Sequence, residues 1–322
     1  MNTNYFVREL WTSEFIKESS EVLSLLEAGL LVEDSEVSNM VNAVDSGKNI
    51  LIPYIQEGLY SEATIMDESN TDIVSQGLLK VQLSAPIAFL AKAYGEKTMS
   101  RITGSGINTL DAANTLFSRD WGKEKMHRMI NSLAGAVASN KTNNASDNVV
   151  SDNTKVFDYG MVVDAQTLAG DQMNDFVAIA VHPTVYGQIK KNDAASVTTV
   201  FDSALDKEVE LYNGMRVILS KAIPNDGTTV TSFLLKPSAF VYATKMLEVP
   251  VESVRNEKTG NGAGSDEVVS RNAFLLTLNG YDFTATTVAG DVPTVSELAD
   301  GTNWSRKVDA GLAPFVAIES KA

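Results

Sequence analysis

The sequence predicts an α+β fold, and three observations support this prediction. Residues 109 to 138 carry the longest amphipathic pattern in the chain, which is typical of one long helix. The half that follows is rich in β-prone runs and contains two Asn-Gly pairs, a dipeptide typical of tight hairpins. Residues 49 to 79 mix short β-prone runs with Gly and Ser, which indicates a long hairpin-like excursion.

Composition limits the chemistry that this chain can perform. A chain of 322 residues with 44% hydrophobic side chains is long enough for about two domains. It has no cysteine, which excludes disulfides, thiolate nucleophiles and cysteine-ligated metal sites. We therefore expect stability to come from packing, strand pairing or association, and we expect no cofactor.

Charge and hydropathy bear on the partners. The chain has 26 basic and 41 acidic side chains, and the net charge of −15 has the wrong sign for tight binding to phosphate backbones. The N-terminus MNTNYFVRELWTSEF has none of the features of a secretory signal, and no run of about 18 apolar residues follows. We expect neither export by a signal peptide nor a membrane partner.

The segment from residue 13 to residue 31 is the first amphipathic stretch. Its apolar residues come in pairs spaced close to a helical repeat, behind a Thr12/Ser13 cap candidate. The pattern predicts an amphipathic helix or an arm that docks one, and ordinary core packing explains it equally well. The pairs are Phe15/Ile16, Val22/Leu23, Leu25/Leu26 and Leu30/Leu31.

The excursion at residues 49 to 79 carries charge of one sign. It contains acidic side chains but no Lys or Arg, so it is either a solvated acidic loop or a loop that lies on a basic surface of another chain. The acidic residues singled out are Glu57, Glu62, Asp67, Glu68 and Asp72.

The long helical pattern at 109 to 138 predicts a strut. Its apolar stripe runs from Leu110 to Val137, and at 1.5 Å per residue the helix would be about 45 Å long. Asp111 near its start and the basic residues Lys123, Lys125 and Arg128 further along suit the helix dipole.

The remaining signals concern connections. The polar stretch at 138 to 154 is typical of a link between domains, and Asn213-Gly214 and Asn279-Gly280 each predict a hairpin between strand-like runs. The glycine-rich stretch at 258 to 266 lacks the Gly-Lys-Ser/Thr ending of a phosphate-binding loop, and we interpret it as a flexible loop tip.

Neither histidine predicts catalysis. His182 follows the apolar run FVAIAV and precedes Pro183, which suits a strand that turns into a helix with Pro183 as its first residue. His127 lies between basic residues of the long helix, and its distance from His182 in sequence gives no metal-ligand spacing. A Mg²⁺ or Ca²⁺ site built from carboxylates alone stays open, although there is no EF-hand loop. We expect no catalytic residue and no enzyme.

Several segments, in their order along the chain, resemble the major capsid proteins of tailed bacteriophages, whose fold is named after phage Hong Kong 97. The resemblance covers most of the chain. The segments are ILIPYIQEGLYSEATIMDES, VAIAVHPTVYGQIKKND, YNGMRVILSKAIP, TSFLLKPSAFVYA, VPVESVRNEKTG, VVSRNAFLLTLNGYDF and VSELADGTNWSRKVDAGLAPFVAI.

The resemblance implies a division of the chain. Residues 1 to 48 correspond to an N-terminal arm, 49 to 85 to an extended β-hairpin called the E-loop, and 86 to 159 to a peripheral domain with a spine helix at about 109 to 138. Residues 160 to 240 correspond to an axial domain, and 241 to 322 return to the peripheral domain.

The resemblance also implies a function. The chain would assemble through hexamers and pentamers into an icosahedral shell around double-stranded DNA, with only weak, non-specific contact to that DNA. It would reside in the virion capsid, and in the host cytoplasm before assembly, with a separate scaffolding protein and a portal as further partners. An encapsulin-like compartment is the first alternative, and a cytoplasmic enzyme using carboxylates and a metal is the second.

Two expectations about assembly follow from the resemblance. Some relatives lock the shell with a covalent Lys–Asn bond from a lysine in the E-loop, whereas residues 49 to 79 contain no lysine and only Lys80 could substitute. The five acidic residues of the excursion should lie over a neighbouring subunit. Their candidate partners are Arg119, Lys123, Lys125 and Arg128 of its spine helix.

Overall fold

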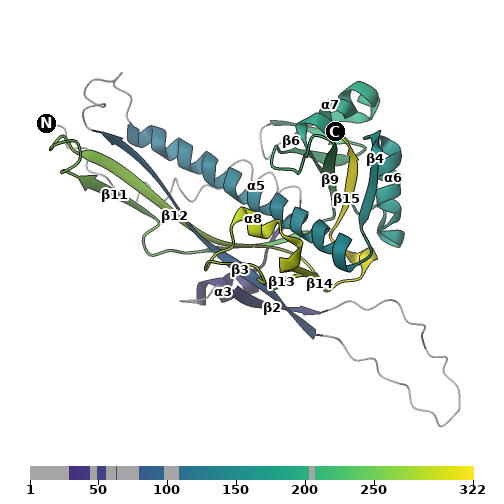
Figure 1. The fold of residues 1–322 in the computed structure, drawn as a ribbon, viewed down its shortest axis with the longest axis horizontal. Coiled ribbons are helices and arrows are strands. Elements are labelled where there is room, and N and C mark those ends of the chain that lie inside the picture. Colours follow the sequence, from purple (N-terminus) through teal and green to yellow (C-terminus); the bar gives the residue numbers. More distant parts are fainter. Residues whose placement is uncertain (1–28, 44–48, 56–62, 64–79, 98–108, 203–206) are drawn as a thin grey trace, which may run out of the picture.

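The protein is described from a computed structural model, which places residues 29–43, 49–55, 63, 80–97, 109–202 and 207–322. Two β-sheets lie at either end of one long helix, α5 (Thr109–Asn143) (Figure 1). One sheet extends into a long projection beside the first half of α5, and the other forms a rounded body beside its second half.

The first sheet has six strands. Its order is β1-β10-β12-β3-β2, and β11 pairs with the part of β12 that lies beyond β10. β3 and β12 are much longer than their neighbours and pair antiparallel along the projection, from Ser265 opposite Lys97 to Leu275 opposite Ile87. The strands are β1 (Leu31–Glu33), β2 (Asn49–Ile55), β3 (Lys80–Lys97), β10 (Phe240–Lys245), β11 (Val251–Asn256) and β12 (Ser265–Leu278).

Two helices cover opposite faces of this sheet. Phe117 and Trp121 of α5 pack with Val251 and Val268 on one face. α3 (Ser35–Ala43) packs on the other face, at the end away from the projection, against a cluster that includes Ile87 and Leu275. Since side chains alternate between the faces of a strand, odd-numbered residues of β3 face the α3 side and even-numbered ones face α5.

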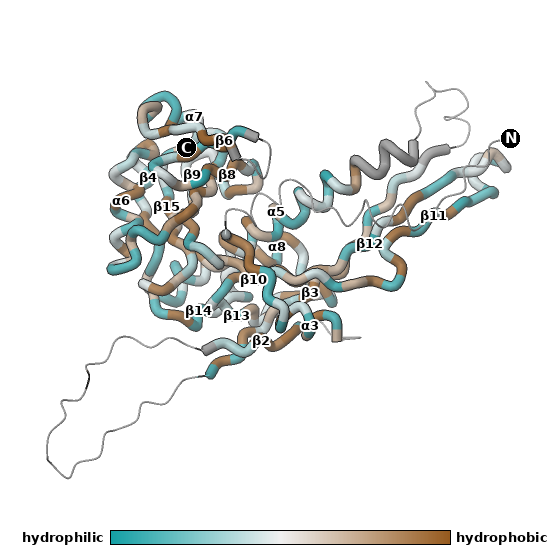
Figure 2. Tube along the Cα trace, turned by 180° about the vertical axis from the view of Figure 1, so that it is seen from behind, coloured by the Kyte–Doolittle hydropathy of each residue, from teal (hydrophilic) through white to brown (hydrophobic). Residues whose placement is uncertain are grey.

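The second sheet has seven strands in the order β4-β15-β9-β5-β8-β7-β6. Its strands β9 and β15 are nearly all buried, with hydrophobic runs at 233–235 and 315–318 (Figure 2). α6 (Tyr159–Thr167) and α7 (Pro183–Asn192) cover one face. The strands are β4 (Val149–Val156), β5 (Ala178–Val181), β6 (Val197–Asp202), β7 (Lys207–Tyr212), β8 (Met215–Leu219), β9 (Thr229–Leu235) and β15 (Phe315–Lys321).

The second half of α5 joins the two sheets. Ile130, Leu133 and Val137 lie in one continuous core with Phe274 of the first sheet and Phe233 of the second. A small unit packs on the same stretch of helix and completes this core. It consists of β13 (Tyr281–Phe283) and β14 (Trp304–Arg306), the short helix α8 (Val295–Leu298) and a 3-10 turn at Gly301–Asn303. Further 3-10 turns lie at Gly170–Gln172, Ala194–Ser196 and Ala310–Leu312.

The structure confirms several of the sequence predictions. The long helix is present and extends five residues beyond 138, to Asn143. Asn213 and Gly214, both with positive φ, form the two-residue turn between β7 and β8. The glycine-rich stretch lies at the tip of the β11–β12 hairpin, although its last two residues belong to β12. β2 and β3 pair antiparallel and form the root of the predicted excursion.

One prediction about connections was wrong, and another holds only in part. Asn279-Gly280 does not close a hairpin, because β12 pairs with β10 and β3 whereas β13 pairs with β14. The Asn279 backbone N–H instead donates to the Ala239 carbonyl, so the turn sends the chain from one sheet to another. The polar stretch at 138 to 154 does connect α5 to the second sheet, but it is largely regular structure, since helix α5 continues in it to Asn143 and its last part is strand β4.

The described residues include only part of the segment assigned to the N-terminal arm. Residues 13 to 28 of the predicted amphipathic segment lie outside the described residues, and its last residue, Leu31, begins β1. The domain boundaries that the sequence predicts near residues 159 and 240 do not coincide with the boundaries between the two sheets. β4 and β15, from segments assigned to the peripheral domain, pair within the seven-stranded sheet. Among the described helices, none is long and apolar enough to cross a membrane.

Gly135 of α5 provides a test of how closely the helix packs. A Cβ there would come within 2.1 Å of the Leu298 carbonyl oxygen, whereas a Cβ on Gly187 of α7 would meet nothing within 4 Å. We expect Gly135→Ala to lower the free energy of unfolding by about 1 to 3 kcal/mol despite the better helix propensity of alanine. The matched Gly187→Ala should raise it by about 0.4 to 1 kcal/mol. Denaturant unfolding of the two variants checks both signs.

Candidate assembly surface

The first half of α5 is fixed to the projection by hydrogen bonds that come from the even-numbered face of β3 and from β12. Tyr94 of β3 donates its hydroxyl to Asp120 of the helix. The Trp121 indole N–H donates to Ser270 Oγ at 3.0 Å. The bond from Tyr94 holds the pKa of Asp120 below its ordinary value and raises the pKa of the tyrosine. The helix therefore has one fixed orientation on the strands.

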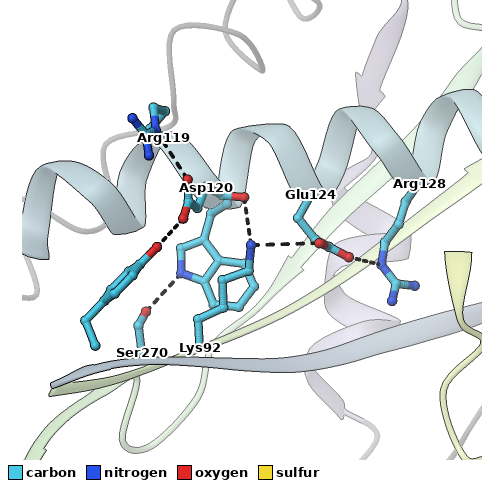
Figure 3. A network of polar contacts seen from close by, with 8 residues as sticks. Lys92, Arg119, Asp120, Glu124, Arg128 and Ser270 are labelled. Carbon is cyan, nitrogen blue, oxygen red and sulfur yellow. Dashed lines mark hydrogen bonds and ion pairs between the residues drawn. The ribbon is translucent and has the colours of Figure 1, made fainter. Parts of the chain in front are cut away.

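Lys92 extends this network along the helix (Figure 3). Its ammonium group donates to the Asp120 carbonyl at 3.1 Å and lies 3.8 Å from Glu124 Oε2. It also lies 5.2 Å from the centroid of the Trp121 ring, within the range of a cation–π contact. Glu124 also accepts a hydrogen bond from Arg128 Nε at 3.2 Å. Lys92 of β3 and Arg128 of α5 therefore alternate with the acidic side chains of Asp120 and Glu124 along this side of the helix.

Two of the four predicted basic partners are used inside the subunit. Lys125 is 9% exposed and donates to the Tyr242 hydroxyl, with its ammonium group 4.8 Å from that ring's centroid. Arg128 is 6% exposed and donates to the Pro293 carbonyl at 3.0 Å as well as to Glu124. Burial lowers the pKa of Arg128. Their burial leaves little of either side chain for an acidic loop of another copy, which counts against these two residues as assembly contacts.

The other two basic residues are at the surface. Arg119 keeps 55% of its side chain exposed, although its Nε lies 3.3 Å from Asp120 Oδ1. Lys123, one turn further along α5, is exposed too. Glu57, Glu62, Asp67, Glu68 and Asp72 lie outside the described residues, so their approach to these two side chains stays a prediction.

A hairpin that the sequence did not single out supplies a second exposed surface. β6 is an edge strand of the seven-stranded sheet, and Val200 and Phe201 on it are 50% and 61% exposed. β6 pairs with β7 alone, and such a two-stranded ribbon with apolar residues in water has little stability by itself. The run VTTVF, which lacks an alternating polar face, is the signal that could have identified it.

The histidines have the structural places that the sequence predicts. His182 caps α7: its Nδ1 accepts from the Thr184 N–H at 3.2 Å, and Pro183 is the first helical residue. Burial, and secondarily the charge of Lys221, lower the pKa of His182. His127 is exposed on α5. Within the described parts of the chain, no three His, Asp or Glu side chains are grouped so that they could hold a metal ion.

Comparison with known proteins shows which family the chain is similar to. The family model described as "Major capsid protein 13-like" matches residues 93–311, which is more than half of the chain. A curated relative, the major capsid protein of Bacillus phage SPP1, is 26% identical over 313 residues, covering 95% of this chain and 94% of the relative.

Solved structures show the same fold at lower identity. The capsid of Ralstonia phage GP4 aligns with a TM-score of 0.55 at 11% identity, over 92% of this chain and 90% of that one. A chain of Microbacterium phage Oxtober96 aligns with a TM-score of 0.54 at 12% identity, over 94% of this chain and 91% of that one. The fold is therefore the Hong Kong 97 type, as the sequence predicts.

Replacing one buried and one exposed basic residue of α5 tests their different roles. Arg128→Ala removes hydrogen bonds from a buried charged group, and we expect it to lower the free energy of unfolding by about 1.5 to 3 kcal/mol. Lys123→Ala removes an exposed side chain and should change it by no more than about 0.5 kcal/mol. Equal effects in denaturant unfolding of the two variants would contradict the assignment of Arg128 to the subunit's own framework.

Proposed function

Because the chain belongs to the major capsid protein 13-like family, we propose that copies of it assemble through hexamers and pentamers into an icosahedral shell around double-stranded DNA. The observation that carries this proposal is the family match together with a fold shared over nine tenths of the capsid chain of phage GP4. The relatives described above are phage proteins, which favours a phage shell over an encapsulin-like compartment or an enzyme.

The exposed β6–β7 hairpin supports assembly through the second sheet. Its apolar residues Val200 and Phe201 gain free energy when they leave water, at roughly 25 cal/mol for each Å² buried. Copies of the same chain arranged head to tail around a closed ring are the simplest partners for such an edge. We assign the seven-stranded sheet with α6 and α7 to the axial domain, which would meet its copies around the five-fold and six-fold axes.

The first sheet and α5 form the peripheral domain in this proposal. The paired strands β2 and β3 are the root of the E-loop. Of residues 1 to 48, which the sequence assigns to an N-terminal arm, β1 and α3 pack in and against the first sheet, so the arm would comprise the residues before β1. The domain boundaries differ from the sequence-based ones in that β4 and β15 belong to the axial body.

Net charge supports weak contact with the enclosed DNA. At −15 per subunit, the shell as a whole would repel phosphate groups on average, which would leave packaged DNA movable. A separate scaffolding protein and a portal complete the set of partners that we propose. The protein would reside in the host cytoplasm before assembly and in the virion capsid afterwards.

The first experiment expresses the full chain, alone and with its phage's scaffolding protein. Size-exclusion chromatography and negative-stain electron microscopy should show closed shells, tubes or rings of five and six subunits. Boiled particles should run as monomers on a denaturing gel, because residues 49 to 79 contain no crosslinking lysine and Lys80 is the first residue of β3. A compact dimer or tetramer with metal-dependent activity would overturn the proposal.

Charge reversal tests the contact between the acidic loop and α5. We expect Glu62→Lys with Asp67→Lys to weaken assembly at low salt, since each exposed ion pair contributes about 0 to 1 kcal/mol and is repeated in every subunit. Adding Arg119→Glu and Lys123→Glu should restore part of the particle yield. Asp171→Lys with Asp291→Lys, at sites away from α5's first half, is the matched control. Unchanged yield and shell stability in the Glu62/Asp67 variant would refute the contact.

A further inference from the structure

The start of helix α7 is built around an imidazole ring. α7 lies on the outside of the rounded body (Figure 1). The His182 carbonyl accepts the first hydrogen bond of the helix, from the Tyr186 N–H at 3.1 Å, and its side chain caps the helix through the Thr184 N–H. The usual capping residues are Ser, Thr, Asp and Asn, so a histidine here is an exception. The first turn of α7 therefore depends on the state of one ring.

The contacts of His182 Nδ1 assign the protonation state of that ring. Nδ1 lies 3.2 Å from the Thr184 backbone nitrogen, 3.0 Å from the Thr184 hydroxyl and 3.4 Å from the Asn225 amide nitrogen. The backbone N–H and the amide nitrogen can only donate, so Nδ1 must accept. A ring nitrogen that accepts carries no hydrogen, and the geometry therefore requires a neutral imidazole with its hydrogen on Nε2.

The same ring reaches a loop that is itself fixed. Asn225 lies in the loop at residues 220 to 228, between β8 and β9. Its Oδ1 accepts from the Gly227 N–H at 2.9 Å, which turns the amide nitrogen toward His182. The Thr231 N–H donates to the Pro224 carbonyl at 3.1 Å and joins the loop to β9. The imidazole thus connects the end of β5, the start of α7 and this loop.

The charged groups of the loop disfavour a positive ring. Lys221 is the basic residue whose charge bears on His182, and burial together with this charge lowers the pKa of the imidazole below its ordinary value. Asp226, the acidic residue of the loop, accepts from the Thr228 and Thr229 N–H groups at 2.8 and 2.6 Å. Its carboxylate is therefore committed to its own turn.

The neighbouring elements add charge of the same sign. The N-terminal end of a helix carries partial positive charge, which opposes an imidazolium. The charged residues of α7 itself, Lys190 and Lys191, lie in its last turn. β15 meets α7 where Gln188 donates to the Lys321 carbonyl at 3.4 Å, and the charged residue that it brings there is again basic. These surroundings keep the ring neutral near neutral pH.

We propose that His182 is a pH-sensitive cap, which holds α7 and the loop at 220 to 228 together near neutral pH and releases both when acid protonates the ring. A hydrogen on Nδ1 would face the Thr184 N–H and the Asn225 amide, two donors that cannot accept it. The imidazolium would also lie at the positive end of α7. This device belongs to the single subunit and does not depend on the proposed capsid function.

Acid should weaken the folded state through this group. The pKa of His182 is below 6.5 in the folded chain, whereas the unfolded chain has the ordinary value. Between the two values the unfolded chain binds a proton that the folded chain does not, so unfolding becomes more favourable. The stabilisation is complete above the ordinary value and is lost as the pH falls through the folded-state value.

Replacing His182 with asparagine separates capping from titration, because asparagine is a preferred cap and keeps no titratable group. We would measure hydrogen–deuterium exchange of the full chain between about pH 5 and 8, comparing variants at equal pH. Protection of residues 183 to 188 in the unsubstituted chain should fall severalfold more on acidification than in His182→Asn. His182→Ala should be less protected at neutral pH and should approach the unsubstituted chain in acid.

Two features of the chain provide matched controls. His127 is the other histidine and is exposed on α5, so His127→Gln should keep the pH response of α7. α6 begins with Asp158, whose carboxylate accepts from the Met161 N–H at 2.9 Å, and its first turn should show no such response. The His127→Gln chain also has a single imidazole, whose ring-proton NMR signal should report a pKa for His182 below the ordinary value.

Two results would overturn the proposal. One is an equal pH response of residues 183 to 188 in the unsubstituted chain and in His182→Asn. The other is an NMR titration of His182 at or above the ordinary pKa of histidine. The titration needs no change at residue 182, so it decides the question even where the His182 variants do not fold.

Discussion

The structure depends on the burial of α5 between two sheets. Its first half lies on the projection of the first sheet, and its second half contributes Ile130, Leu133 and Val137 to the core that both sheets share. Part of this helix is buried on nearly all sides, so its polar side chains there must find hydrogen-bond partners inside the subunit. Ser139 donates to the Trp304 carbonyl at 2.7 Å, and the Asn140 amide donates to the Tyr281 hydroxyl at 2.9 Å.

The enclosure of α5 also buries two of its charged side chains. Lys125 and Arg128 look in the sequence like surface residues of a helix's second half, which is why they were predicted to be assembly contacts. The periodicity places them on a helix, but it does not reveal that β10 and β12 of the first sheet and the segment just before α8 cover that side. Only tertiary packing separates them from Arg119 and Lys123, and it does so through Tyr242, Phe274 and the Pro293 carbonyl.

Sequence patterns were reliable where local chemistry decides the conformation. The His182-Pro183 start of α7 and the Asn213-Gly214 turn each depend on backbone preferences of two or three adjacent residues. Asn279-Gly280 has the same turn chemistry, yet a turn does not dictate which strand pairs with which. The family resemblance supplied the fold, whereas the burial of Lys125 and Arg128 could be seen only with the strands and the segment that pack on α5.

The position of β15 has a consequence for the order of folding. In the seven-stranded sheet β4 pairs with β15 alone, and β15 pairs with β9 on its other side. Residues 149 to 156 therefore have no place in the sheet until residues 315 to 321 have been synthesised and inserted beside β9. A growing chain can form α5 and the β7–β8 hairpin early, but it completes the seven-stranded sheet only after this late strand arrives.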